Sequence, residues 1–196
     1  MIDMAQFEKE GFVITAPLFS SEEVQQLTTL LEEQKQNDEG PRRGGLRDVL
    51  DNLPALRGTS NHTAIRAIVD QVHGKDAFAV RATLFDRMVT VRIHLDACPA
   101  SNGALRVMPG THLLGKVNQN HVDKHVDEAS AIYCEAGAGE ALVMRPLLLH
   151  ASSAAEHPGH RRVLHFDYAI GDLAAGLEWR MQAQVGTEFS KSLQLS

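Results

Sequence analysis

Three short stretches of this 196-residue chain carry side chains that could bind a metal ion or an anion. In the first stretch, Arg92, His94 and Asp96 are spaced two residues apart, and alternate residues of a strand project to the same face. An imidazole and a carboxylate so placed can reach one metal ion, and two histidines with one carboxylate are the ligands that hold ferrous iron in oxygenases. The competing interpretation is a hydrogen-bonded core histidine before an aspartate that begins a turn, and it is the commoner one for an isolated pair.

The other two stretches each present a histidine or an arginine at a strand end. An apolar strand is expected to end at His150, which would place an imidazole at a barrel mouth; a core histidine bonded to a backbone carbonyl is the commoner outcome. Arg161 follows eleven residues later. Facing inward, its guanidinium could clamp a carboxylate with two parallel hydrogen bonds, and facing outward it would be solvated. His165 and Asp167, in phase with Arg161, form a second His-x-Asp pair that rivals the first as a metal site.

Composition and charge argue against several classes of protein. Lys and Arg number 19 against 25 Asp and Glu, so the net charge is −6, whereas nucleic-acid binding needs a basic face. No apolar run approaches the roughly 20 residues of a membrane helix, and the acidic N-terminus lacks the pattern of a secretory signal. Cys98 and Cys134 form no disulfide framework, and we expect both thiols to be inert. We therefore expect a cytoplasmic protein that binds neither nucleic acid nor membranes.

Helical signals precede strand signals along the chain. Ser20 and Glu23 form a capping box at the start of a predicted helix. Helices are expected at residues 4–10, 21–35 and 62–73, and strands at 12–15, 78–84, 89–95, 104–108, 131–134, 141–144, 147–150 and 162–168. This order predicts an α+β protein with a β-sandwich or jelly-roll core.

Three segments, in this order, resemble the phytanoyl-CoA dioxygenase family. They read FEKEGFVITAPLFSSEEVQQL, VRIHLDACPASNGALRVMPGTHLLGKV and AGEALVMRPLLLHASSAAEHPGHRRVLHFDYA. The resemblance implies a double-stranded β-helix (a cupin-like jelly roll) with N-terminal helices, which holds Fe(II) and takes 2-oxoglutarate as cosubstrate. It also implies hydroxylation of a small organic substrate, with release of succinate and CO₂. On this basis residues 1–196 form a single domain, with a helical part at 1–75, a β core at 76–170 and a tail at 171–196.

The resemblance assigns roles to individual residues and also shows a departure from the family. His150 matches the distal metal histidine, Arg161 matches the arginine that binds the far carboxylate of 2-oxoglutarate, and Arg92 looks like a second cosubstrate contact. The family carries its metal His-x-Asp pair on a long stretch that this chain lacks, because Asp86 runs directly into Arg87. We therefore expect a shortened chain with an incomplete core.

Two functional outcomes follow from the missing stretch. In the first, His94 and Asp96 are recruited to form a metal triad with His150, and the chain is a 2-oxoglutarate-dependent oxygenase. In the second, the chain is a non-catalytic relative that binds a small carboxylate through Arg161, or retains no activity. A plain interaction domain is a third interpretation, and both the substrate and the oligomeric state stay open.

Overall fold

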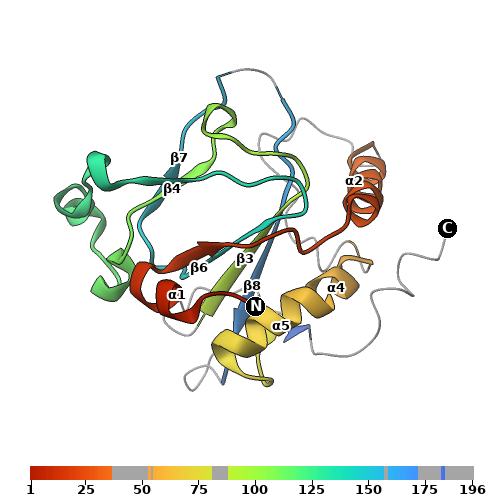
Figure 1. The fold of residues 1–196 in the computed structure, drawn as a ribbon, viewed down its shortest axis with the longest axis horizontal. Coiled ribbons are helices and arrows are strands. Elements are labelled where there is room, and N and C mark those ends of the chain that lie inside the picture. Colours follow the sequence, from red (N-terminus) through yellow and green to blue (C-terminus); the bar gives the residue numbers. More distant parts are fainter. Residues whose placement is uncertain (37–52, 54, 81–87, 157–158, 172–181, 184–196) are drawn as a thin grey trace.

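Helices occupy the first part of the chain and short strands most of the rest (Figure 1). The computed structural model describes residues 1–36, 53, 55–80, 88–156, 159–171 and 182–183. The α-helices are α1 (Met4–Glu10), α2 (Ser21–Gln36), α4 (Ala55–Ser60) and α5 (Thr63–His73). The strands are β1 (Phe12–Ile14), β2 (Phe78–Val80), β3 (Met88–His94), β4 (Leu105–Val107), β5 (Ile132–Cys134), β6 (Ala141–Met144), β7 (His150–Ser152), β8 (Val163–Ala169) and β9 (Gln182–Ala183). Short 3-10 helices lie at η2 (Ala100–Asn102), η3 (Thr111–Leu114), η4 (Gln119–His125) and η5 (Glu128–Ser130).

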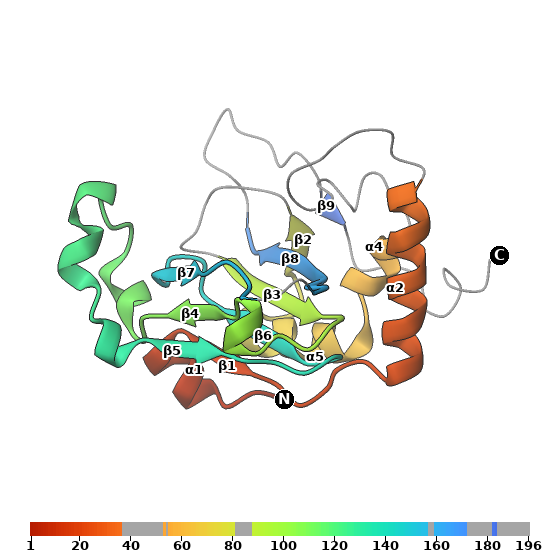
Figure 2. The same ribbon diagram turned by 90° about the horizontal axis from the view of Figure 1, so that it is seen from above.

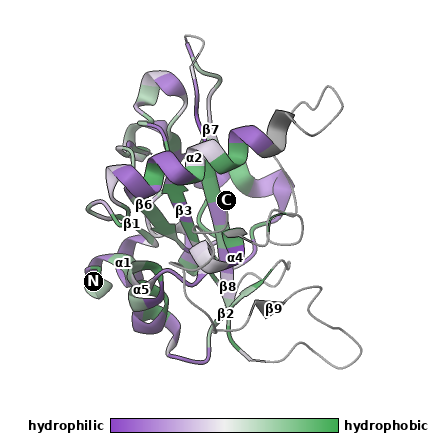
Figure 3. Ribbon diagram, turned by 90° about the vertical axis from the view of Figure 1, so that its right-hand side faces the viewer, coloured by the Kyte–Doolittle hydropathy of each residue, from purple (hydrophilic) through white to green (hydrophobic). Residues whose placement is uncertain are grey.

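The capping box predicted before α2 is confirmed. The Ser20 backbone N–H donates to Glu23 Oε2 at 2.8 Å, and the Glu23 backbone N–H donates to Ser20 Oγ at 3.2 Å. These two bonds satisfy donors that a helix start otherwise leaves unpaired. In Figure 3, α2 carries both hydrophilic and hydrophobic residues, as expected for a helix that buries one side, and Leu27 is its fully buried residue.

The strands form two antiparallel sheets that lie one over the other (Figures 1 and 2). The larger sheet has the order β1-β6-β3-β8-β2-β9, and the smaller has the order β5-β4-β7. β3 is central, because all seven of its residues pair with β8 on one side and residues 90–93 pair with β6 on the other. The register of β3 with β8 places Arg92 opposite His165 and His94 opposite Val163.

The side chains on the two faces of β3 lie in different environments. Val89, Val91 and Ile93 belong to the large core cluster, which includes residues of α1, α2, α4, α5 and β8. Since side chains alternate along a strand, Thr90, Arg92 and His94 face the other way, toward the smaller sheet. A second apolar cluster fills the space between the sheets near β6 and β4; its members are Phe12, Leu105, Val107, Cys134, Leu142, Met144 and Leu148.

Two of the elements that differ from the sequence expectation are β7 and α4. The strand expected at 147–150 begins only at His150, because Leu148 N–H donates to the Arg145 carbonyl at 3.0 Å and closes a turn. The side chain of Leu148 then packs into the core between the sheets. Helix α4 was not expected, since Gly58 and Thr59 are weak helix formers. Residues 81–87, which include the junction of Asp86 with Arg87, lie outside the described part of the chain.

Helix α4 is tied to the large sheet by a buried hydrogen bond. The Tyr168 hydroxyl of β8 donates to the Ser60 carbonyl at 2.6 Å, and both residues are fully buried. Burial raises the pKa of Tyr168, so the hydroxyl stays protonated. None of the described helices has the length and apolar character needed to span a membrane.

We expect Tyr168→Phe to lower the free energy of unfolding by about 1–2 kcal/mol, because the Ser60 carbonyl stays buried and loses its donor. Urea unfolding measures this loss as a lower midpoint, and the dependence of the unfolding free energy on urea concentration should stay the same. Tyr133→Phe is the control, since Tyr133 is 45% exposed and its change should cost less than about 0.5 kcal/mol. Equal losses in the two variants would contradict a structural role for this bond.

Candidate functional site

A small pocket opens between the two sheets, on the polar face of β3. Its volume is about 180 Å³. The pocket is lined by Arg92 and His94 of β3, Leu105 of β4, Ser152 of β7 and Val163 of β8, and by three residues outside the strands, Cys98, Gly103 and Arg161. No carboxylate is among the described residues that line it. Two guanidinium groups therefore face a small space without an acidic neighbour in the lining.

Arg92 is held in the pocket by the central strand. Burial lowers the pKa of Arg92, and the nearby charge of Arg161 lowers it further. One of its terminal nitrogens lies 3.4 Å from His165 Nδ1 across the β3–β8 pair, while its buried Nε has no hydrogen-bond partner among the described residues. The two arginines thus repel each other across a partly desolvated space, and an anion between them would relieve that repulsion.

Among the described residues that line the pocket, His94 is the one histidine. Its side chain is 3% exposed, and neither ring nitrogen has a hydrogen-bond partner among the described residues. Burial lowers the pKa of His94 to about 4, and the charge of Arg92 adds to this effect. The imidazole is therefore neutral at pH 7, with one nitrogen able to donate and the other able to accept.

The tip of Arg161 is fixed by the turn that follows η2. Arg161 Nη1 donates to the Gly103 carbonyl at 2.6 Å. Gly103 has φ 74°, and a Cβ at this position would collide with Arg161 Nη1 and would lie 2.5 Å from the Ser153 carbonyl oxygen. A glycine is required both for this backbone conformation and for the approach of the guanidinium. The sequence prediction gave Gly103 no part in the site.

Asp96 lies outside the pocket lining and is engaged by Arg162. Asp96 Oδ2 accepts from the Arg162 backbone N–H and from Arg162 Nε, each at 2.8 Å, and Asp96 Oδ1 accepts from Arg162 Nη2 at 2.6 Å. These bonds hold the pKa of the Asp96 carboxyl below its usual range. β3 ends at His94, so the alternation that put Asp96 in phase with His94 does not continue through Asp96.

His150 lies near the pocket without lining it. It is the first residue of β7, is exposed, and its Nδ1 lies 2.7 Å from the Leu148 carbonyl oxygen. Two residues further along the same strand, Ser152 lines the pocket. His150 is therefore two residues, or about 6.6 Å along the strand, from Ser152 in the pocket lining.

The rival pair, His165 and Asp167, faces the same side of the large sheet as Arg92. His165 Nε2 lies 3.1 Å from Asp167 Oδ1, and Thr90 Oγ1 donates to the same oxygen at 2.6 Å. The other ring nitrogen of His165, Nδ1, faces Arg92, so both nitrogens of this imidazole already have polar neighbours. This pair forms a polar row across β3 and β8 beside the pocket.

The described residues do not fit a three-ligand iron site. His94, Asp96 and His150, predicted as a metal triad, are not brought together: His94 lines the pocket, and the other two do not. In the part of the chain that the structure describes, no group of three His, Cys, Asp or Glu side chains is placed to hold a metal ion. The triad stays a prediction. The structure does bring Arg92, His94 and Arg161 to one pocket.

The two thiols are buried near this site. Burial raises the pKa of Cys98, which lines the pocket, and raises the pKa of Cys134 to about 12. Both cysteines are therefore protonated at neutral pH and poor nucleophiles, in agreement with the inert thiols expected from the sequence.

Comparison with known families identifies the chain at this point. The family model for phytanoyl-CoA dioxygenase matches residues 60–163. The chain belongs to this family. The match spans α5, the strands on both sides of the pocket and Arg161. A search of curated protein sequences gave no match.

Several solved structures share the fold. EctD from S. alaskensis, solved with bound Fe, has 14% identity and a TM-score of 0.71 over 94% of this chain and 80% of its own. HygX from Streptomyces hygroscopicus, solved with nickel and 2-oxoglutarate, has 16% identity and a TM-score of 0.70 over 86% and 87%. The epimerase SnoN from nogalamycin biosynthesis, described as non-heme and alpha-ketoglutarate-dependent, has 15% identity and a TM-score of 0.69 over 84% and 80%.

These comparisons confirm the fold and the class of protein. The α+β, cupin-like jelly roll expected from the sequence is shared with the solved oxygenases. The family is one of 2-oxoglutarate-dependent dioxygenases, so the interpretation of the chain as a member of this enzyme class is confirmed at the level of the family.

The depressed pKa of His94 predicts a loss of stability in acid. Its folded-state pKa of about 4 lies below the ordinary value of 6.5, so the unfolded chain binds a proton first as the pH falls. Between pH 7 and pH 5 this should cost at most about 2 kcal/mol, with little further loss below pH 4. Urea unfolding at several pH values measures how the free energy of unfolding depends on pH. His94→Gln should reduce this dependence. The pKa of His73 is also lowered to about 4, so His73→Gln should reduce the pH dependence in the same way; an unchanged pH dependence in either variant would refute the assignment for that histidine.

Proposed function

We propose that this chain binds 2-oxoglutarate in the pocket between the sheets, with Arg161 and Arg92 as the groups that hold its carboxylates. The supporting observation is the placement of two guanidinium groups and a neutral imidazole around one small space. Guanidinium pairs with carboxylate through two parallel hydrogen bonds, which gives both affinity and orientation. His94 can donate one further hydrogen bond from its unpartnered ring.

The size and charge of the pocket favour a small dicarboxylate. A volume of about 180 Å³ is well below the roughly 300–1,000 Å³ of sites that enclose drug-sized ligands. Two positive charges match the two negative charges of 2-oxoglutarate at neutral pH. A monocarboxylate would leave one guanidinium without a partner in a partly desolvated space, so it should bind more weakly.

A second candidate is the activity of the family, hydroxylation of a small organic substrate by Fe(II) and 2-oxoglutarate. Family membership supports it, and so does the free imidazole of His94 in the pocket. When bound, iron would supply the oxidation of the substrate C–H bond. A three-ligand set of His94, Asp96 and His150 would require Asp96 to leave Arg162 and His150 to turn into the pocket. Because Asp96 is already bonded to Arg162, carboxylate binding is the function that the described residues support without rearrangement.

Arg161→Gln should weaken 2-oxoglutarate binding by about 10- to 100-fold, because a charge-assisted pair contributes roughly 1.5–3 kcal/mol. Isothermal titration of the metal-free protein measures the change. Arg106→Gln is the matched control, since Arg106 of β4 pairs with Glu128 outside the pocket lining, and this variant should bind like the wild type. Titration of the wild type that gives no heat and no shift in melting temperature would refute the proposal.

Oxygenase activity is tested separately from binding. With Fe(II), ascorbate, O₂ and 2-oxoglutarate, the carboxylate-binding interpretation predicts binding without succinate formation. Succinate that depends on Fe(II), and that is lost in His94→Ala, would instead establish the second candidate. His73→Ala is the control for the histidine, because His73 lies on α5 and outside the pocket lining.

A further inference from the structure

Asp96 does not line the pocket, yet it is bound to the residue next to the pocket arginine. Its two carboxylate oxygens accept three hydrogen bonds from Arg162, at 2.6–2.8 Å. One of these comes from the backbone N–H, so Asp96 holds the main chain of Arg162 as well as its side chain. The Arg162 carbonyl in turn accepts from the Leu95 backbone N–H at 2.9 Å. Residue 162 is therefore tied at its N–H, its carbonyl and its guanidinium.

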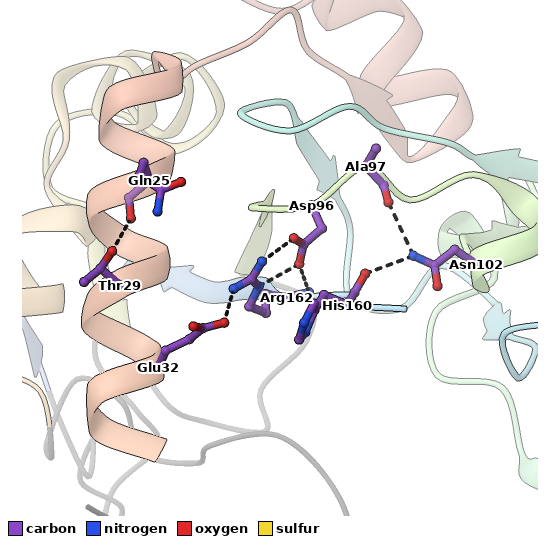
Figure 4. A network of polar contacts seen from close by, with 8 residues as sticks. All are labelled: Gln25, Thr29, Glu32, Asp96, Ala97, Asn102, His160 and Arg162. Carbon is purple, nitrogen blue, oxygen red and sulfur yellow. Dashed lines mark hydrogen bonds and ion pairs between the residues drawn. The ribbon is translucent and has the colours of Figure 1, made fainter. Parts of the chain in front are cut away.

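The residue on the other side of Arg161 is also tied. The carbonyl of His160 accepts from Asn102 Nδ2 at 3.1 Å, and the same amide lies 3.4 Å from the Ala97 carbonyl (Figure 4). Arg161 thus lies between two residues that are each bound to the loop between β3 and β4. Its own tip reaches that loop again, at the Gly103 carbonyl. The loop between β3 and β4 therefore holds the two chain neighbours of the pocket arginine as well as its guanidinium.

We propose that Asp96 is a positioning residue. By holding Arg162, it fixes the backbone just before β8, and this backbone directs the side chain of Arg161 into the pocket. This role differs from the metal-ligand role predicted for Asp96 from the sequence, and it rests on the proposed binding of 2-oxoglutarate. Arg162 has a second ion pair, with Glu32 of α2 at 2.6 Å, which joins the outer end of the guanidinium to the helix (Figure 4). Glu32 makes no bond to the Arg162 backbone among the interactions described.

Glu32 supplies a matched control for Asp96. Asp96→Ala and Glu32→Ala each remove one carboxylate partner of Arg162 and one negative charge. Loss of a negative charge near the pocket should by itself strengthen the binding of an anion. The positioning role predicts the opposite sign for Asp96→Ala alone, so a general electrostatic effect and a positioning effect are distinguishable.

The experiment is a double-mutant cycle on 2-oxoglutarate binding by the full chain. We expect Asp96→Ala to raise the Kd at least tenfold and Glu32→Ala to change it less than twofold. In the background of Arg161→Gln, Asp96→Ala should have little further effect, because Asp96 acts through Arg161. Equal effects of the two alanine variants, or an undiminished effect of Asp96→Ala in that background, would overturn the proposal. If Asp96→Ala does not fold, Asp96→Asn takes its place with the same expectations.

A second measurement separates this proposal from the proposed function. The Nε–Hε resonance of Arg161, assigned by its loss in Arg161→Gln, reports the position of the guanidinium without any ligand. Asp96→Ala should shift or broaden this signal, and Glu32→Ala should leave it in place. If the wild type binds no 2-oxoglutarate and these shifts are still seen, the proposed function fails and the positioning role stands. An unshifted signal in Asp96→Ala would overturn the positioning role whatever the binding result.

Discussion

The pairing of β3 with β8 determines both the core and the pocket of this protein. Both strands alternate between a face that packs against the helices and a face that looks toward the smaller sheet. Because apolar side chains of α4 and α5 cover the first face, a slip of one residue would bury Arg92 and His94 among them. The hydrophobic pattern therefore fixes the register, and the register then brings the polar residues of β3 beside the start of β8.

The pocket combines a positive charge with partial exclusion of water. Burial lowers the pKa of both Arg92 and His94, but the consequences differ. A histidine with a pKa of about 4 gives up its proton at neutral pH, whereas an arginine keeps its proton and its charge. The result is a neutral donor and acceptor beside two cations. Such a set attracts an anion and provides directed hydrogen bonds to it.

Local signals in the sequence were sufficient for most elements and for part of the site. The capping box at Ser20 and Glu23, and the strand containing Arg92 and His94, depend on neighbouring residues and were predicted correctly. The place of Asp96 depends on where β3 ends and on a partner 66 residues away, which no local pattern encodes. The same holds for Gly103, whose importance comes from the guanidinium that packs against it.

The distinction between an anion site and a metal site follows from the charges that face the pocket. A divalent cation needs anionic or neutral ligands that outweigh its loss of water, and the described lining offers one imidazole between two guanidinium groups. Binding of a carboxylate is favourable instead, because each guanidinium gains an ion-pair partner and the repulsion between the two guanidinium groups falls. Asp96 contributes to this preference indirectly: its charge is neutralised by Arg162, so it leaves the pocket positive while it holds the residue that follows Arg161. Anion binding is thus the chemistry that these residues can provide by themselves.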